Sequence, residues 1–213
     1  MECRICETRK ARRYCPGVGG DICSQCCGTE REVSIDCPLD CEYLLEARKH
    51  EKFTEVDPKL IPNQDVRVTD EFMNEHEALL DALARMLLGA TLSAAGANDN
   101  DLREALETMI RTYRTRQSGL IYESRPTNPV AGLIQQRTLE EIGRFQEAEA
   151  RQTGVHSMRD ADVLGVLVFL QRVGIHWDNK RPRGRSFLSF LLQRYGQERP
   201  LAAEQQSPSL IIP

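Results

Sequence analysis

The chain has 213 residues, enough for one core of ordinary size and a small satellite domain. Its 28 basic and 32 acidic residues give a net charge of −4, which argues against the overall positive charge typical of nucleic-acid-binding proteins. It opens without an apolar signal core, and its longest apolar stretch, residues 163–170, is far below the ~20 residues of a membrane span. We therefore expect a cytoplasmic protein with reduced thiols and no membrane partner.

The cysteines are concentrated at the start of the chain, and none follows Cys41. They are spaced Cys3-x2-Cys6, Cys15, Cys23-x2-Cys26-Cys27 and Cys37-x3-Cys41. Eight thiolates are what two closed tetrahedral sites require, and Zn²⁺ is the ion that such spacings most often bind. A segment this short has few aliphatic residues, and each structural zinc can supply about 10 kcal/mol of folding free energy. The pattern predicts two structural Zn²⁺ ions.

Other uses of the thiols stay open. Disulfides would require export, and the adjacent Cys26 and Cys27 could not pair with each other without strain. An iron–sulfur cluster is a further alternative, because it also uses four thiolates. A catalytic zinc would need an open coordination position and a nearby general base, whereas four thiolates close the coordination sphere. We therefore expect the metal to be structural.

Residues 3–50 resemble the HIT-type zinc finger, and more loosely the MYND and B-box fingers with the same cross-braced treble-clef plan. The resemblance lies in the Cys3-x2-Cys6 opening, in Tyr14-Cys15-Pro16 and in Cys23-Ser-Gln-Cys26. In these fingers the first and third cysteine pairs hold one zinc, and the second and fourth pairs hold the other. The resemblance implies a first site made of Cys3, Cys6, Cys23 and Cys26.

The second site departs from the family pattern, because Val18 stands among glycines where the family has another cysteine. The spare thiol is Cys27, whereas His50 lies nine residues past the last cysteine and is a poor substitute. The second site is therefore assigned to Cys15, Cys27, Cys37 and Cys41. Asp36 as N-cap, Pro38 in the first turn and a helix over residues 39–52 would place the last two thiols one turn apart on one helix face.

The rest of the chain predicts a roughly five-helix bundle over residues 69–196, after a linker at residues 53–68. Apolar residues recur at helical spacing between caps and breakers. The predicted helices run from Thr69 to Leu87, from Leu102 to about Gly119, from Pro129 (capped by Asn128) past Phe145, from Ala161 to Val173 (after a capping box at Ser157–Asp160 and closed by Gly174), and from Ser186 to Tyr195 (ended by Gly196). Residues 197–213 are too polar to fold alone, although their end is apolar. The fold class is mainly α, with a two-zinc treble-clef-like module at residues 1–52.

Two basic segments, residues 9–13 and 180–185, are candidate contact surfaces. The second segment collects Lys180, Arg181, Arg183 and Arg185 close to Trp177, the only tryptophan. Four cations beside an aromatic ring predict an anion or nucleic-acid contact, or else a solvated connection whose tryptophan packs back onto the bundle. The first segment either offsets thiolate charge or contacts an acidic partner.

No catalytic residues are predicted, because the sequence carries no phosphate loop, no His-Glu-x2-His and no nucleophile elbow. Since related fingers usually mediate protein contacts, the resemblance implies a non-enzymatic zinc-binding adaptor or regulator with an unidentified protein partner. The first alternative is a nucleic-acid-associated protein that uses the two basic segments. The second is an enzyme with an unrecognised site in the bundle. Gly143 and Gly165, inside predicted helices, are expected to be packing positions.

Overall fold

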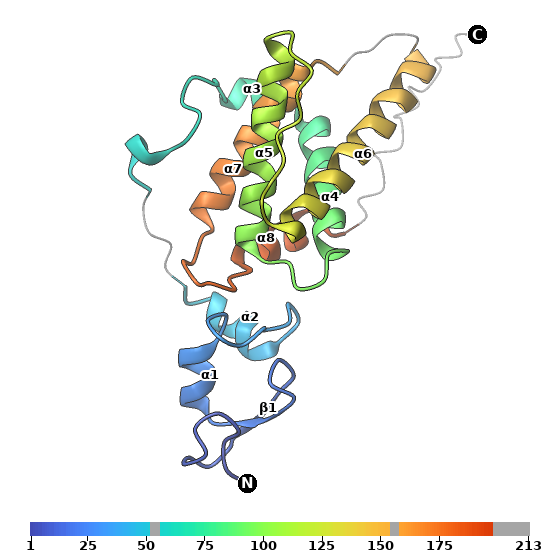
Figure 1. Ribbon diagram of the computed structural model, residues 1–213. Helices are drawn as coiled ribbons and strands as arrows, with labels where there is room; N and C mark the ends of the chain where they lie inside the picture. Colours follow the sequence, from blue (N-terminus) through green and yellow to red (C-terminus); the bar gives the residue numbers. More distant parts are fainter. Residues whose placement is uncertain (52–55, 154–157, 198–213) are drawn as a thin grey trace, which may run out of the picture.

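The computed structural model describes residues 1–51, 56–153 and 158–197. A small cysteine module, residues 1–51, lies against one end of a helical bundle (Figure 1). The described residues form eight α-helices and one two-stranded sheet, so the prediction of a mainly α-helical chain is confirmed. None of the helices in these ranges is both long and apolar enough to cross a membrane.

The cysteine module is built from a hairpin and two short helices. Strand β1 (Arg13–Cys15) pairs antiparallel with β2 (Gly20–Ile22), and they are followed by α1 (Ser24–Glu30) and α2 (Glu42–Arg48). Besides cysteines, its buried apolar residues are Ile22, Ile35 and Leu44. Burial of three such side chains contributes only about 5–9 kcal/mol, so this module needs a further source of stability.

The predicted helix over residues 39–52 is wrong at its start, because α2 begins at Glu42 with Cys41 as its N-cap. Cys37 lies before the helix, where the N–H of Cys41 donates to the Pro38 carbonyl across a turn at 3.2 Å. The Asp36 carboxylate pairs with Arg185 instead of capping a helix. The last two thiols therefore flank a turn and do not share a helix face.

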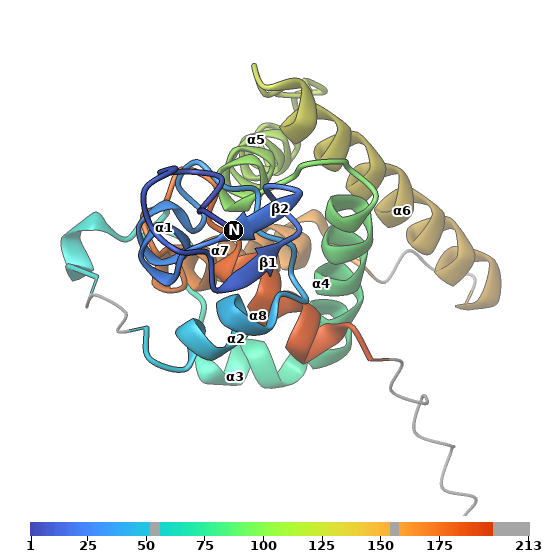
Figure 2. The ribbon, with the colours of Figure 1, turned by 90° about the horizontal axis from the view of Figure 1, so that it is seen from below.

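The bundle consists mainly of five helices. They are α4 (Glu77–Leu92), α5 (Asp99–Gln117), α6 (Pro129–Thr153), α7 (Asp160–His176) and α8 (Ser186–Tyr195). Helix α5 packs against α6 and α7, and α4 packs against α6 and α8 (Figure 2). Apolar residues are buried on nearly every side of α7, as expected for a central helix. The predicted linker contains the 3₁₀ turn Pro58–Leu60.

The caps of α6 and α8 follow the sequence signals. The Asn128 side chain accepts the Val130 N–H at the start of α6. Gly196 is the C-cap of α8. These ends depend on residues close in sequence, so local patterns predict them.

Several helix boundaries differ from the prediction. Helix α5 begins at Asp99, before the predicted Leu102, because Asn98 and Asp101 form a capping box there. The first predicted helix is divided into α3 (Asp70–Glu75) and α4 at His76, whose Nδ1 lies 2.8 Å from the Phe72 carbonyl oxygen. Helix α7 begins at Asp160 after the N-cap Arg159, and it continues through Gly174 to His176. A Cβ at Gly174 would lie 3.0 Å from the Phe187 ring, so this glycine permits close packing and does not end the helix. Ser157 and most of the tail, residues 198–213, lie outside the described residues.

The two helical glycines Gly143 and Gly165 allow a matched test of packing. A Cβ at Gly165 would lie 2.4 Å from the Phe72 ring, whereas one at Gly143 would meet nothing within 4 Å, so the packing prediction holds only for Gly165. We expect Gly165→Ala to lower the free energy of unfolding by about 1–3 kcal/mol through overpacking. Gly143→Ala should raise it by about 0.5–1 kcal/mol, because alanine favours the helix. Urea denaturation of both variants checks this, and equal effects would contradict it.

Candidate metal centre

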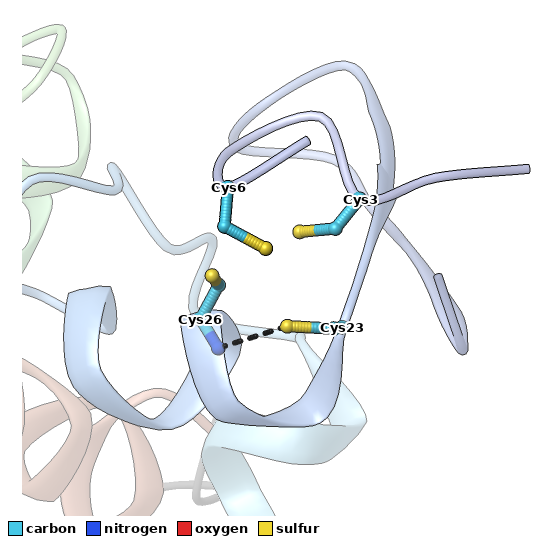
Figure 3. A group of neighbouring side chains, drawn as sticks. All are labelled: Cys3, Cys6, Cys23 and Cys26. Carbon is cyan, nitrogen blue, oxygen red and sulfur yellow. Dashed lines mark hydrogen bonds between the residues drawn. The ribbon is translucent and has the colours of Figure 1, made fainter. Parts of the chain in front are cut away.

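The first thiol set, Cys3, Cys6, Cys23 and Cys26, is brought together into a compact cluster (Figure 3). Their four sulfurs all lie within 4.8 Å of one another. Tetrahedral Zn²⁺ with Zn–S bonds of about 2.3 Å would place the sulfurs about 3.8 Å apart, so small side-chain movements suffice to close the site. The donor set fits one metal ion held by sulfur alone.

Local backbone structure positions these thiols. In the N-terminal turn, the N–H of Cys3 donates to the Arg9 carbonyl at 2.8 Å and its carbonyl accepts the Glu7 N–H at 2.8 Å. Cys23 is the N-cap of α1, and its Sγ accepts the N–H of Cys26 at 3.4 Å (Figure 3). One thiol pair thus comes from a turn and the other from a helix start.

The electrostatics of the first set favour a bound cation. Hydrogen bonds from the Thr8 side chain and from the backbone of Thr8 and Arg9 lower the pKa of Cys6 to about 5. Burial, together with the neighbouring thiols Cys23, Cys6 and Cys3, raises the pKa of Cys26 to about 12. Four adjacent thiolates repel one another, so the last proton is retained until a metal ion supplies positive charge.

The second thiol set, Cys15, Cys27, Cys37 and Cys41, lines one small cavity of about 10 Å³ together with neighbouring residues of the module. Cys15 ends β1, Cys27 lies in α1, and the other two flank the turn before α2. Successive residues on a helix point about 100° apart, so α1 can direct Cys26 to one set and Cys27 to the other. Across the described ranges, only the first set has at least three potential ligands close enough to hold a metal.

Two guanidinium groups approach Cys27. Its Sγ lies 3.8 Å from Nη1 of Arg13 and 3.7 Å from Nη2 of Arg31. The Arg13 guanidinium also lies 3.9 Å from the centre of the Tyr43 ring. A hydrogen bond to the Cys23 side chain raises the pKa of Arg9. Part of the basic segment 9–13 therefore contacts the thiols, as expected if its charge offsets theirs.

The basic loop 180–185 meets the cysteine module. Arg185 is only 8% exposed and hydrogen-bonds to carbonyls of both parts of the chain. Arg181 donates to the Arg31 carbonyl at 2.8 Å, and the backbone N–H of Arg183 donates to the Glu32 carbonyl at 2.9 Å. Lys180 pairs with Asp178 through the 2.8 Å Nζ–Oδ2 contact. The expectation of a solvated connection is therefore wrong for Arg185.

Trp177, in contrast, packs onto the bundle. Its ring stacks on Phe190 with a centroid distance of 4.8 Å, and it contacts the main hydrophobic core. We expect Trp177→Ala to lower the free energy of unfolding by about 3–5 kcal/mol, because truncation empties a packed site. Thermal and urea unfolding check this, with Tyr122→Ala as the control because Tyr122 is an exposed aromatic side chain. Equal losses would contradict it.

Glu32 is a buried ionic residue that sequence analysis missed. It is completely buried, and its φ of 53° lies in the left-handed region. Its carboxylate accepts from Arg48 at 2.7 Å, from the backbone N–H of Arg185 at 2.9 Å and from Asn179 at 2.9 Å. In sequence, Glu30-Arg31-Glu32 looks like an exposed charged turn, so no local signal indicated this role.

Asp99 is a second buried carboxylate near this contact. It accepts the N–H groups of Phe187 at 2.9 Å and Leu188 at 3.0 Å, in the first turn of α8. Burial raises its pKa to about 7, whereas an unfolded aspartate titrates near about 3.9. Between these values the folded chain binds more protons, so this group makes the free energy of unfolding fall as pH rises from about 4 to 7.

We therefore expect the stability advantage of the wild-type chain over Asp99→Asn to shrink as pH rises through this window. Each pKa unit corresponds to about 1.4 kcal/mol. Urea unfolding at several pH values measures the difference. The matched control is Asp65→Asn, at an exposed carboxylate whose pKa is lowered by Arg114. A constant difference between wild type and Asp99→Asn would contradict the expectation.

Comparison with protein-family models, curated proteins and solved structures finds no match for this chain. The geometry and chemistry of the thiols therefore carry the functional argument.

Proposed function

We propose that this chain is a non-enzymatic zinc-binding interaction protein, an adaptor or regulator whose N-terminal module is a cross-braced finger similar to the HIT type. The observation that carries the proposal is the four-thiol cluster with all sulfurs within 4.8 Å. Four thiolates leave no coordination position for water, so such a site stabilises a fold and does not activate a nucleophile. Since reduced thiols are required, a cytoplasmic location is part of the proposal.

A second Zn²⁺ belongs to the same proposal. Its support is the cavity shared by the second thiol set and the two guanidinium groups at Cys27. Guanidinium groups near sulfur favour the thiolate form that binds metal. The module also has only three buried aliphatic residues, too few to explain its order without metal.

We expect two zinc ions per chain. Elemental analysis of the purified reduced protein measures the content, and Cys6→Ser and Cys41→Ser should each lower it by one. His50→Ala is the matched control and should keep both ions, because the His50 ring is 77% exposed and pairs with Glu46. Absorption typical of iron and sulfide, or oxidised cysteines in place of metal, would contradict the proposal.

The finger presents apolar side chains to solvent, which favours a protein partner. Tyr14 is 62% exposed and Val33 is 41% exposed. The cations that a nucleic acid would need are partly engaged within the protein, notably Arg13 at a thiol and Arg185 at buried carbonyls. These contacts favour a protein partner over nucleic acid.

The partner experiment compares full-length variants in capture from the native cell. Replacing Tyr14 and Val33 by serine should abolish a specific partner, whereas Leu92→Ser, an exposed apolar residue of the bundle, should leave it bound. Binding to DNA and RNA is measured in parallel at low and moderate salt, and none is expected. Submicromolar binding that weakens steeply with salt would instead establish the nucleic-acid alternative.

A further inference from the structure

The contacts between the cysteine module and the bundle begin close to the second thiol set. Cys37 and Cys41 flank a turn whose middle residue, Leu39, packs against the hydrophobic core of the bundle. The first set takes Cys3 and Cys6 from the N-terminal end of the chain, and this end of the module points away from the bundle (Figure 1). The two sets therefore differ in how closely they adjoin the bundle.

Arg185 joins three parts of the chain at this interface. Its Nη1 donates to the carbonyl of Cys37 at 2.8 Å, and its Nε donates to the Ala97 carbonyl at 2.9 Å. Its Nη2 lies 2.6 Å from the carboxylate of Asp36. The residue is also the N-cap of α8. One buried guanidinium thus connects a second-set thiol residue with the α4–α5 loop and the start of α8.

The adjacent backbone repeats this arrangement. The N–H groups of Arg183 and Arg185 donate to the carbonyl and the carboxylate of Glu32 in the module. Between them, the Gly184 carbonyl accepts the N–H of Asp99 in α5 at 2.8 Å. A Cβ at Gly184 would lie 2.4 Å from the Asn179 side-chain oxygen and 3.1 Å from the Arg181 carbonyl oxygen, so glycine leaves room for this tight turn. Successive loop residues therefore bind the module and the bundle alternately.

We propose that a metal ion in the second thiol set controls the docking of the cysteine module on the bundle, with Arg185 as the positioning residue that links them. This rests on the proposed second zinc site. A metal bound by Cys37 and Cys41 fixes the turn between them, and this turn presents Asp36, the Cys37 carbonyl and Leu39 to the bundle. Without the metal the turn is free to move, and a buried guanidinium loses acceptors that it cannot replace.

The coupling is reciprocal, because binding free energies are linked. If bound metal strengthens docking of the module by some factor, then docking strengthens metal binding by the same factor. A variant that weakens docking should therefore bind zinc less tightly, although it keeps all eight cysteines. Zinc affinity is therefore a readout that would not change if Arg185 only supported the start of α8.

The experiment uses the full chain loaded with Zn²⁺. It measures zinc content, zinc affinity against a chromophoric chelator, and the hydrogen-exchange rate of the peptide covering residues 183–188.

Cys41→Ser should lose one zinc ion, and the exchange rate of residues 183–188 should rise about 5- to 150-fold, the factor that ordinary coupling free energies produce. Cys6→Ser should also lose one zinc, with exchange in residues 183–188 unchanged. Equal exchange in the two variants, or no rise in Cys41→Ser, would overturn the coupling.

Arg185→Met keeps both thiol sets, so it tests the proposal even where the cysteine variants fail to fold. It should weaken the second zinc about 5- to 150-fold. Its matched control is Arg183→Met, an exposed neighbour in the same loop, which should change nothing. Unchanged zinc affinity in Arg185→Met would overturn the coupling alone. If the wild-type chain held only one zinc ion and Cys41→Ser held the same number, this result would rule out the second site and, with it, the coupling.

Discussion

Replacement of Glu32 by alanine is expected to lower the free energy of unfolding by about 3–5 kcal/mol, because it leaves a largely buried guanidinium without its ionic partner. Arg48, which donates to Glu32 at 2.7 Å, has a side chain only 10% exposed and comes from α2 of the same module. Two further donors, the backbone N–H of Arg185 and the amide of Asn179, would also lose their acceptor. Chemical denaturation of the metal-loaded chain measures the loss.

The matched control for Glu32 is Glu46→Ala, which removes an exposed ion pair with Lys49 from α2. An exposed pair contributes about 0–1 kcal/mol, so this variant should be close to wild type. Glu32→Gln separates charge from shape, because it keeps one acceptor oxygen but cannot neutralise the arginine. A loss for Glu32→Ala as small as that for Glu46→Ala would show that the contact between module and bundle is not a stable part of the fold.

Removal of the metal is expected to have the largest effect on the cysteine module. Each structural zinc contributes about 10 kcal/mol, whereas the module buries only Ile22, Ile35 and Leu44 besides its cysteines. Treatment with a chelator under reducing conditions should therefore unfold residues 1–51. Most helical circular dichroism should persist, because the bundle has a continuous core of its own.

The bundle should nevertheless melt at a lower temperature after chelation. When the module unfolds, Leu39 no longer packs against the bundle core, and Arg185 loses the ordered Cys37 carbonyl that accepts its hydrogen bond. Circular dichroism melting with and without chelator measures this shift, and addition of Zn²⁺ should reverse it. An unchanged melting temperature would show that the bundle is independent of the module, and complete loss of helix would show that the two share one folding unit.

The sequence predicted features that depend on neighbouring residues. The resemblance to known fingers implied the first set, and a turn and a helix start bring Cys3, Cys6, Cys23 and Cys26 within range of one ion. Asn128 and Gly196 predicted the start of α6 and the end of α8 because each cap acts on residues next to it in sequence. Where a tertiary contact competed with the local signal, as at Gly174 beside Phe187, the predicted boundary was wrong.

Tertiary structure alone decided the roles of the charged residues. Glu32 and Arg185 look like solvent-exposed charges in sequence, yet both are buried, because each meets partners far along the chain. Burial of a charge is favourable only where hydrogen bonds and an opposite charge offset the loss of water, and these partners exist only after the module docks on the bundle. Local patterns thus determined most of the helices, and the cysteine motifs pointed to the first thiol cluster, whereas long-range packing determined which charges hold the two parts together.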